Sequence, residues 1–224
     1  MTSTEYAPGR HADLLGEPAQ PPVLLWHGKQ ADARAVMRPL AELVAGYGLA
    51  VVVPDWDARA GDGGRAALLQ SARFTRDWSG QPQRLVLAGW SMGGAAAAGL
   101  TLLADRFGVE VAHTVCLAGA FTVPDPFGAT LFAEVPDATT APTPFTLLHG
   151  LADDVVPVAA SREFAAGLMK RGWPVQLVEL TADHGTIAGA RYDSAADGYL
   201  PAGDPDALAV AAGVAARIAA VAAG

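Results

Sequence analysis

Three polar side chains stand directly after apolar stretches and carry the groups that acyl transfer needs. Ser91 lies in the stretch 89–94 (GWSMGG), Asp153 in 149–157 (HGLADDVVP) and His184 in 183–185 (DHG). A serine hydroxyl becomes a strong nucleophile when a histidine removes its proton and a carboxylate orients that histidine. We therefore interpret Ser91 as a nucleophile, His184 as its general base and Asp153 as the acid that orients the base.

The serine stands between a predicted strand and a predicted helix. The apolar stretch 84–88 precedes it, and a stretch of helical character begins at Met92. A serine on such a turn is held in a strained conformation, the flanking glycines admit a close backbone approach, and the helix N-terminus favours developing negative charge. A glycine turn without chemistry is the alternative, and the strand-to-helix context favours the nucleophile.

Three aspartates compete for the role of the acid. Asp153 follows the apolar stretch 145–148, and the carboxyl ends of parallel strands are where open α/β sheets gather their ligands. An isolated loop aspartate is more often a turn former or a helix cap. Asp125 follows the preceding predicted strand, and Asp154 is the direct neighbour of Asp153. We rank them Asp153, Asp125, Asp154, because adjacent side chains in an extended loop point in different directions and both cannot face His184.

The other four histidines are interpreted as structural. His27 and His149 are expected to be buried supports of their loops, His113 lies in a predicted strand and His11 lies near the N-terminus. A metal hydrolase is a competing hypothesis, since His149, Asp153, Asp154 and His184 are possible ligands. No H-x-x-E-H or similar ligand spacing accompanies them. We expect no metal and no organic cofactor.

The elements that position these residues alternate between short apolar stretches and helical stretches. This alternation predicts an α/β fold, a doubly wound, mostly parallel sheet with helices on both faces. The predicted strands are 23–26, 49–53, 84–88, 111–117, 145–148 and 175–180, and the predicted helices are 33–47, 64–78, 92–106, 159–171 and 206–221. Residues 11–15 are predicted to add an edge strand. The proline-rich segment 121–144 is predicted to be a surface excursion, too short for a cap domain.

Length and composition indicate one globular unit. The 224 residues are 51% hydrophobic and 17% charged, and they predict a single domain over 1–224. A net charge of −8 argues against binding to nucleic acid, whose phosphates attract basic surfaces. Cys116 lies in an apolar stretch and is expected to be a buried thiol.

Neither end of the sequence predicts a membrane or export signal. Residues 1–5 are polar and acidic where a signal peptide would be basic and then apolar, so a cytoplasmic protein is expected. The alanine-rich stretch 206–224 is interrupted by Arg217, and it is predicted to pack on the sheet rather than to span a membrane.

Together these motifs resemble those of α/β-hydrolase serine esterases. The likeness rests on 89–93 (GWSMG), the 149–157 block, the late His184, an apolar strand running into His27-Gly28 and another ending at 53–55 (VPD). The order serine, aspartate, histidine is the order associated with this fold. The chain is similar to compact carboxylesterases and dienelactone-hydrolase-like members. The resemblance implies hydrolysis of a small-molecule ester through an acyl-enzyme, and it leaves the oligomeric state open.

Two departures from the family pattern bear on the chemistry. Lipase-like members have H-G-G-G where this chain has His27-Gly28-Lys29-Gln30. The resemblance therefore implies an oxyanion hole made by the backbone N–H groups of Met92 and Lys29, with Gln30 as the alternative to Lys29. Dienelactone hydrolases proper use a cysteine, so their substrate is not implied here. A thioesterase, lactonase, peptidase or acyltransferase could use the same triad, and a non-catalytic binding protein of this fold is a further alternative.

Overall fold

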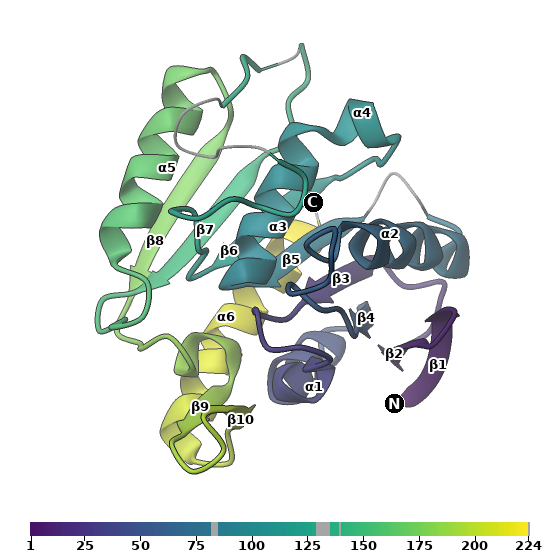
Figure 1. Cartoon of the computed structure of the whole chain (residues 1–224), viewed down its shortest axis with the longest axis vertical. Coiled ribbons are helices and arrows are strands. Elements are labelled where there is room, and N and C mark those ends of the chain that lie inside the picture. The colour runs from purple at the N-terminus through teal and green to yellow at the C-terminus, as the bar shows by residue number, and fades with distance from the viewer. Residues whose placement is uncertain (82–84, 129–134, 139, 224) are drawn as a thin grey trace.

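The computed structural model of the chain is built around an eight-stranded sheet (Figure 1) and describes residues 1–81, 85–128, 135–138 and 140–223. The strand order is β1-β2-β4-β3-β5-β6-β7-β8, in which the six strands from β3 to β8 are parallel and β1 and β2 are antiparallel additions. The strands are β1 Thr2–Ala7, β2 Arg10–Leu15, β3 Pro22–Trp26, β4 Ala50–Pro54, β5 Val86–Trp90, β6 His113–Leu117, β7 Phe145–Gly150 and β8 Val175–Leu180. The predicted mostly parallel α/β sheet is confirmed.

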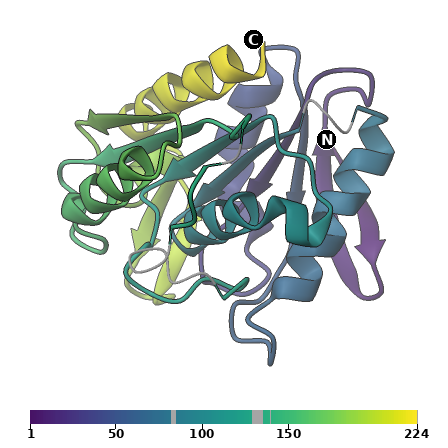
Figure 2. The ribbon, with the colours of Figure 1, turned by 90° about the horizontal axis from the view of Figure 1, so that it is seen from above.

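Helices cover both faces of the sheet, as Figure 2 shows. They are α1 Arg38–Ala45, α2 Arg65–Ser79, α3 Met92–Leu102, α4 Ala104–Phe107, α5 Val158–Lys170 and α6 Pro205–Ala222. Side chains that alternate along a strand point to opposite faces. Val23 and Leu25 of β3 accordingly pack in the cluster that contains α1 and α6, whereas Leu24 and Trp26 pack with α2 and α3. Helix α5 packs on the same face as α3.

Two of the predicted helices are each divided into two elements in the structure, whereas the other three differ by one residue at each end. The stretch predicted as one helix over 33–47 begins as the 3-10 helix η1 (Arg34–Met37), and α1 starts at Arg38 with Pro39 in its first turn. Proline lacks an N–H group and is tolerated in that turn, where the N–H has no partner within the helix. The stretch 92–106 divides after Leu102, because Leu103 leaves the helical conformation (φ −115°, ψ 20°) before α4 begins.

The amino-terminal edge of the sheet was predicted incorrectly. The strand expected at 11–15 exists as β2, but it lies inside the sheet between β1 and β4. Strand β1 forms the edge, and five of its six residues are exposed or half-buried, so it carries no apolar stretch that the sequence could reveal. The start of the predicted strand at residue 84 lies outside the described residues.

The segment 121–144 is more buried than the predicted surface excursion. In the part of it that the structure describes there is no helix or strand, yet Phe121, Phe127 and Val135 are buried. The ring of Phe121 stacks on Phe164 of α5, with 4.2 Å between the ring centroids. These apolar side chains anchor the segment on the helices. The rest of the predicted excursion, at 129–134 and 139, lies outside the described residues.

Two predictions about apolar segments concern α6 and Cys116. Within the described residues α6 alone is long and apolar enough to cross a membrane, by length and composition only. One side of it is buried, and Val214, Ala215 and Ile218 on that side pack in the cluster that contains α1 and the sheet.

Cys116 is buried in β6, its thiol donates to the carbonyl of Gly94 at 3.3 Å, and burial raises the pKa of that thiol. The predicted buried thiol is confirmed.

Candidate active site

Ser91 occupies a strained turn between β5 and α3. Its backbone has φ 56° and ψ −117°, a conformation that residues other than glycine rarely adopt and that costs about 1–3 kcal/mol. The Ser91 N–H donates to the carbonyl of Leu117 at 2.8 Å. The Ser91 carbonyl accepts hydrogen bonds from the N–H groups of Gly94, Ala95 and Ala120 at 3.0–3.1 Å. These four bonds hold the turn in place, and the residue remains half-buried.

The glycines on either side of Ser91 are required by close backbone approaches. A Cβ atom added at Gly89 would lie 2.1 Å from the carbonyl oxygen of Gly93. One added at Gly93 would lie 2.3 Å from the carbonyl oxygen of His27. Contacts this short do not occur, so any side chain at these positions would displace the backbone. The glycines predicted to admit a close approach do so.

The structure brings Asp153 and His184 into direct contact. Nδ1 of His184 lies 2.8 Å from Oδ2 of Asp153, and both side chains are almost entirely buried, at 3% and 0% exposure. The other carboxylate oxygen, Oδ1, accepts from the N–H groups of Val155 and Val156 at 2.9 and 2.8 Å. Burial raises the pKa of Asp153, but the bonds from His149, His184 and Val156 outweigh it and hold that pKa well below its usual range. Asp153 is therefore an anion.

His149 is a second histidine on the same carboxylate. Its Nε2 lies 3.3 Å from Oδ2 of Asp153 and 2.8 Å from the carbonyl oxygen of Val156. Because a carbonyl only accepts, Nε2 carries the proton, and Nδ1 accepts from the hydroxyl of Ser161 at 2.7 Å. The side chain is fully buried. His149 thus supports its loop, as predicted.

His27 supports the loop after β3 in a similar way. Its Nδ1 donates to the carbonyl of Gly28 at 2.8 Å, and Nε2 accepts from the N–H groups of Ala33 and Trp56 at 3.3 and 3.2 Å. Complete burial lowers the pKa of His27 to about 4, so the imidazole is neutral. This predicted support is also confirmed. Among the described residues, no group of three or more histidine, cysteine, aspartate or glutamate side chains is placed to hold a metal ion.

The two lower-ranked aspartates have other surroundings. Asp125 is buried, and its Oδ1 accepts from the N–H of Phe127 at 2.7 Å. That oxygen lies against α3, where a Cβ added at Gly99 would meet it at 2.1 Å. Asp154 is exposed. Of the three candidates ranked from the sequence, Asp153 is the one that is bonded to His184.

Two aromatic side chains hold His184, and neither was singled out from the sequence. The indole N–H of Trp90 donates to the carbonyl of His184 at 2.7 Å, and the two ring centroids are 5.3 Å apart. Since Trp90 directly precedes Ser91, this contact brings the serine turn and the histidine loop together at the carboxyl ends of the strands. The ring of Tyr199 lies 5.8 Å from that of His184. Trp90 is part of the GWSMGG motif and was a visible candidate, whereas no signal in the sequence marks Tyr199.

Tyr199 belongs to a small hairpin that was not predicted. The strands β9 (Ala190–Asp193) and β10 (Gly198–Pro201) form a separate two-stranded sheet after the histidine loop. In Figure 1 this hairpin lies beside α6, below the end of β8. Most of its residues are exposed or half-buried, which explains why no apolar pattern predicted it.

The two predicted oxyanion donors belong to α3 and to the loop after β3. Met92 is the first residue of α3, directly after Ser91. Lys29 is exposed and follows Gly28, whose added Cβ would lie 3.4 Å from the Cβ of Ser91. The backbone of the loop after β3 therefore passes close to the serine side chain.

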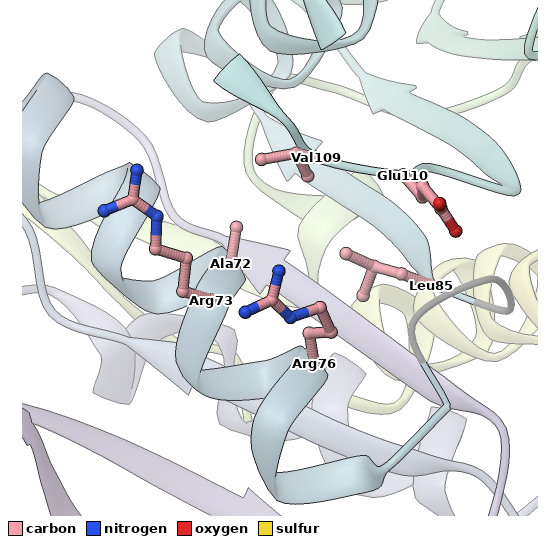
Figure 3. A pocket seen from close by; sticks show the side chains of 6 residues that line it. All are labelled: Ala72, Arg73, Arg76, Leu85, Val109 and Glu110. Atoms are coloured by element: carbon pink, nitrogen blue, oxygen red, sulfur yellow. The ribbon is translucent and has the colours of Figure 1, made fainter. Parts of the chain in front are cut away.

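A hollow beside α2 lies at the other end of β5 from Ser91. Figure 3 shows Arg73 and Arg76 of α2 on one side of it and Val109 and Glu110 on the other. It is also lined by Leu85, which stands before the first residue of β5, whereas Ser91 follows the last. The hollow thus lies at the amino end of β5 and Ser91 at the carboxyl end.

Comparison with known proteins identifies the fold. No family model matches the sequence, and no curated protein matches it. A solved structure of Thermogutta terrifontis esterase 2 phosphorylated by paraoxon has 19% identity and a TM-score of 0.70, over 92% of this chain and 86% of that one. The thermophilic esterase Est2 of this Planctomycetes species with propionate bound has 18% identity and a TM-score of 0.70, over 96% and 92%. The structure of the same esterase with butyrate bound has 19% identity and a TM-score of 0.66, over 93% of this chain and 87% of that one. From this likeness and the strand order, the chain has the α/β-hydrolase fold.

Proposed function

We propose that this protein is a serine hydrolase that cleaves carboxylic esters through an acyl-enzyme. The observation that carries the proposal is the buried Asp153–His184 hydrogen bond, placed beside a serine on a strained strand-to-helix turn. A turn of this kind is a nucleophile elbow, which exposes a serine hydroxyl at the top of an α/β-hydrolase sheet. Ser91 is the proposed nucleophile, His184 the general base and Asp153 the acid.

The bond to Asp153 supports a separate proposed task for each nitrogen of His184. Nδ1 faces the Asp153 carboxylate, which holds the imidazole in one tautomer with Nε2 unprotonated. Nε2 takes the proton of the Ser91 hydroxyl as its oxygen attacks the ester carbonyl, and then gives that proton to the departing alcohol. Water attacks the acyl-enzyme by the same route and releases the acid. The anionic Asp153 stabilises the imidazolium formed in each half of the reaction.

Two backbone N–H groups are proposed to stabilise the oxyanion. Met92 begins α3, where the helix dipole favours negative charge, and Lys29 lies in the loop whose glycine closely approaches Ser91. Each such donor contributes about 10²–10³ in kcat in a type case. The Lys29 side chain is exposed and plays no part in this role.

The proposed substrates are small esters with short acyl chains. The similar esterase is known in forms modified by paraoxon and in forms with propionate or butyrate bound. We infer that this chain accepts acyl groups of that size and forms a stable adduct with organophosphates. The reaction needs no metal or organic cofactor. The one cysteine is a buried thiol, which suits a reducing compartment, and we infer a cytoplasmic enzyme built as one domain over 1–224.

Labelling with a fluorophosphonate, together with hydrolysis of p-nitrophenyl acetate, butyrate and octanoate, tests this proposal. The wild-type protein is expected to take up the label and to hydrolyse acetate and butyrate esters faster than octanoate. Ser91→Ala is expected to lose the label and at least about 10⁴-fold in kcat while folding normally. Ser3→Ala, at an exposed serine of β1, is the matched control and should keep both. Hydrolysis retained by Ser91→Ala would overturn the proposal.

A further inference from the structure

Tyr199 lies between the histidine loop and the loop after β3, and the structure ties it to both. We propose that Tyr199 is a positioning residue for His184, and that the Gln30 side chain fixes Tyr199 and so links the base to the loop that carries Lys29. The inference rests on the proposed function, because it assigns His184 the role of general base. It adds Tyr199, which no sequence motif contains, and it gives the side chain of Gln30 a role distinct from that of a backbone donor.

The ring of Tyr199 completes an aromatic enclosure around the imidazole. Its centroid is 5.8 Å from that of His184 and 4.9 Å from that of Trp90, which it meets edge-on at 86°. The Trp90 ring lies 5.3 Å from His184. A Cβ added at Gly185, the residue after His184, would lie 3.0 Å from Cε1 of Tyr199. The absence of a side chain at Gly185 therefore lets the tyrosine ring approach the histidine loop.

Gln30 holds the backbone of Tyr199 through two hydrogen bonds. Its Oε1 accepts from the Tyr199 N–H at 2.9 Å, and its Nε2 donates to the Tyr199 carbonyl at 3.4 Å. One side-chain amide thus bonds both polar backbone groups of one strand residue. A Cβ added at Gly198 would lie 2.9 Å from Oε1 of Gln30, so the glycine before Tyr199 leaves room for the amide. Gln30 directly follows Lys29, so the clamp joins β10 to that loop.

The position of the imidazole needs such support because its other contacts leave one motion open. The bond from Nδ1 to Asp153 fixes one nitrogen, and the bond from Trp90 fixes the main-chain carbonyl. The ring can still pivot about the Nδ1–Asp153 direction, and that pivot moves Nε2 relative to Ser91. The rings of Trp90 and Tyr199 restrict it. A displacement of about 1 Å in a reacting group can cost about 10²-fold in rate.

The ring of Tyr199, and not its hydroxyl, carries this role. Burial, together with the nearby charges of Asp153, Asp154 and Asp183, raises the pKa of Tyr199 to about 12. The hydroxyl is therefore protonated at neutral pH and does not act as a base toward His184. Phenylalanine keeps the ring, so it is the conservative replacement, whereas leucine removes the ring.

Steady-state kinetics on p-nitrophenyl acetate and butyrate test the role of Tyr199. Tyr199→Leu is expected to lower kcat by about ten- to a hundredfold with KM within about twofold, and by the same factor on both esters, because a displaced base slows chemistry whatever the acyl group. Tyr199→Phe is expected to restore most of the lost turnover. Tyr192→Leu is the matched control, since this exposed tyrosine of the same hairpin packs on Tyr199 and not on His184. It should stay within about twofold of wild type.

Gln30 supplies a second, independent test on an exposed side chain. Gln30→Ala is expected to lower kcat by about three- to tenfold, and the double variant with Tyr199→Leu to be no slower than Tyr199→Leu alone, because residues that act through one another are not additive. Additive losses would overturn the link. A change in KM that depends on the acyl chain would make Tyr199 a substrate contact and would also overturn the inference. If Ser91→Ala is inactive while Tyr199→Leu has wild-type kcat, this inference fails and the proposed function stands.

Discussion

At the scale of single residues, the site is organised by one carboxylate and the groups around it. Asp153 accepts from two backbone N–H groups through Oδ1 and from His184 through Oδ2, and Nε2 of His149 lies 3.3 Å from Oδ2. Burying a charge without such partners would cost several kcal/mol, and the pKa of the group would rise. Here the donors lower that pKa, so the carboxylate stays charged beside His184.

Replacement of the three candidate aspartates distinguishes the acid. Asp153→Asn is expected to lose at least about 10²-fold in kcat with little change in KM, because an amide presents its own donors and cannot stabilise the imidazolium. The kcat values of Asp154→Asn and Asp125→Asn are expected to stay within about tenfold of the wild-type value. The measurement is kcat and KM of the three variants on one activated ester. A large loss of kcat confined to Asp125→Asn would assign the acid to the earlier strand end.

Two replacements of Lys29 distinguish a role of its backbone N–H group from a role of its side chain. The proposed oxyanion donor is its N–H group, so Lys29→Ala is expected to keep most of the activity, since the side chain is exposed. Lys29→Pro removes the N–H and is expected to lose about 10²-fold or more in kcat. Ester hydrolysis by the two variants is compared after circular dichroism shows that both are folded. Equal damage by alanine would assign the role to the ammonium group instead.

At the scale of elements, α3 approaches the sheet more closely than a helix with ordinary side chains could. From Gly93 to Leu102 every residue of α3 is buried, and five of these ten positions are alanine or threonine. Near the helix N-terminus the backbone of Gly93 passes against the carbonyls of Trp26 and His27 at the end of β3. This packing sets the position of Ser91 relative to the loop that carries Lys29.

Two glycine-to-alanine replacements in helices test this packing. Gly93→Ala is expected to lower the free energy of unfolding by at least about 2 kcal/mol, because its Cβ would lie 2.3 Å from the His27 carbonyl oxygen. Gly213→Ala in α6 is the matched control, since its Cβ would meet only Nη1 of Arg217 at 3.5 Å. It should gain up to about 1 kcal/mol from helix propensity. Urea titration measures both, and equal effects would contradict the close approach.

At the scale of the whole molecule, buried neutral histidines couple folding to pH. Burial lowers the pKa of His27 from 6.5 to about 4, although its bond to the Gly28 carbonyl opposes that change. In the unfolded chain His27 binds a proton below about pH 6.5, whereas in the folded chain it binds one only below about pH 4. The stabilisation from the neutral form is therefore complete above pH 6.5 and declines as the pH falls toward 4. Burial also lowers the pKa of His113, which acts in the same direction.

Unfolding by urea at different pH values measures this coupling. Between pH 7 and pH 5, His27 alone is expected to remove about 2 kcal/mol from the free energy of unfolding. Asp153 does not contribute in this range, because with its lowered pKa it is ionised in both states there. His27→Gln should flatten the dependence, and His11→Gln, at an exposed histidine of β2, should not. An unchanged slope in His27→Gln would contradict a neutral buried imidazole.

Local sequence patterns were enough to predict the central sheet and the turn that carries Ser91. Strands β3 to β7 are buried almost throughout, so they appear as short apolar stretches between turns. The glycines around Ser91 and the residues after β7 and β8 are local patterns that stand beside those stretches. These features depend on neighbours in the chain, and the sequence displays such neighbours directly.

The folded structure was needed to show which aspartate contacts His184 and which residues surround that histidine. Asp153 and His184 are separated by 31 positions, and Gln30 and Tyr199 by 169, so no local pattern relates them. The edge strand β1 and the hairpin that carries Tyr199 are largely exposed and lack an apolar stretch to mark them. Contacts between distant segments depend on how all the elements pack, and that packing exists only in the folded chain.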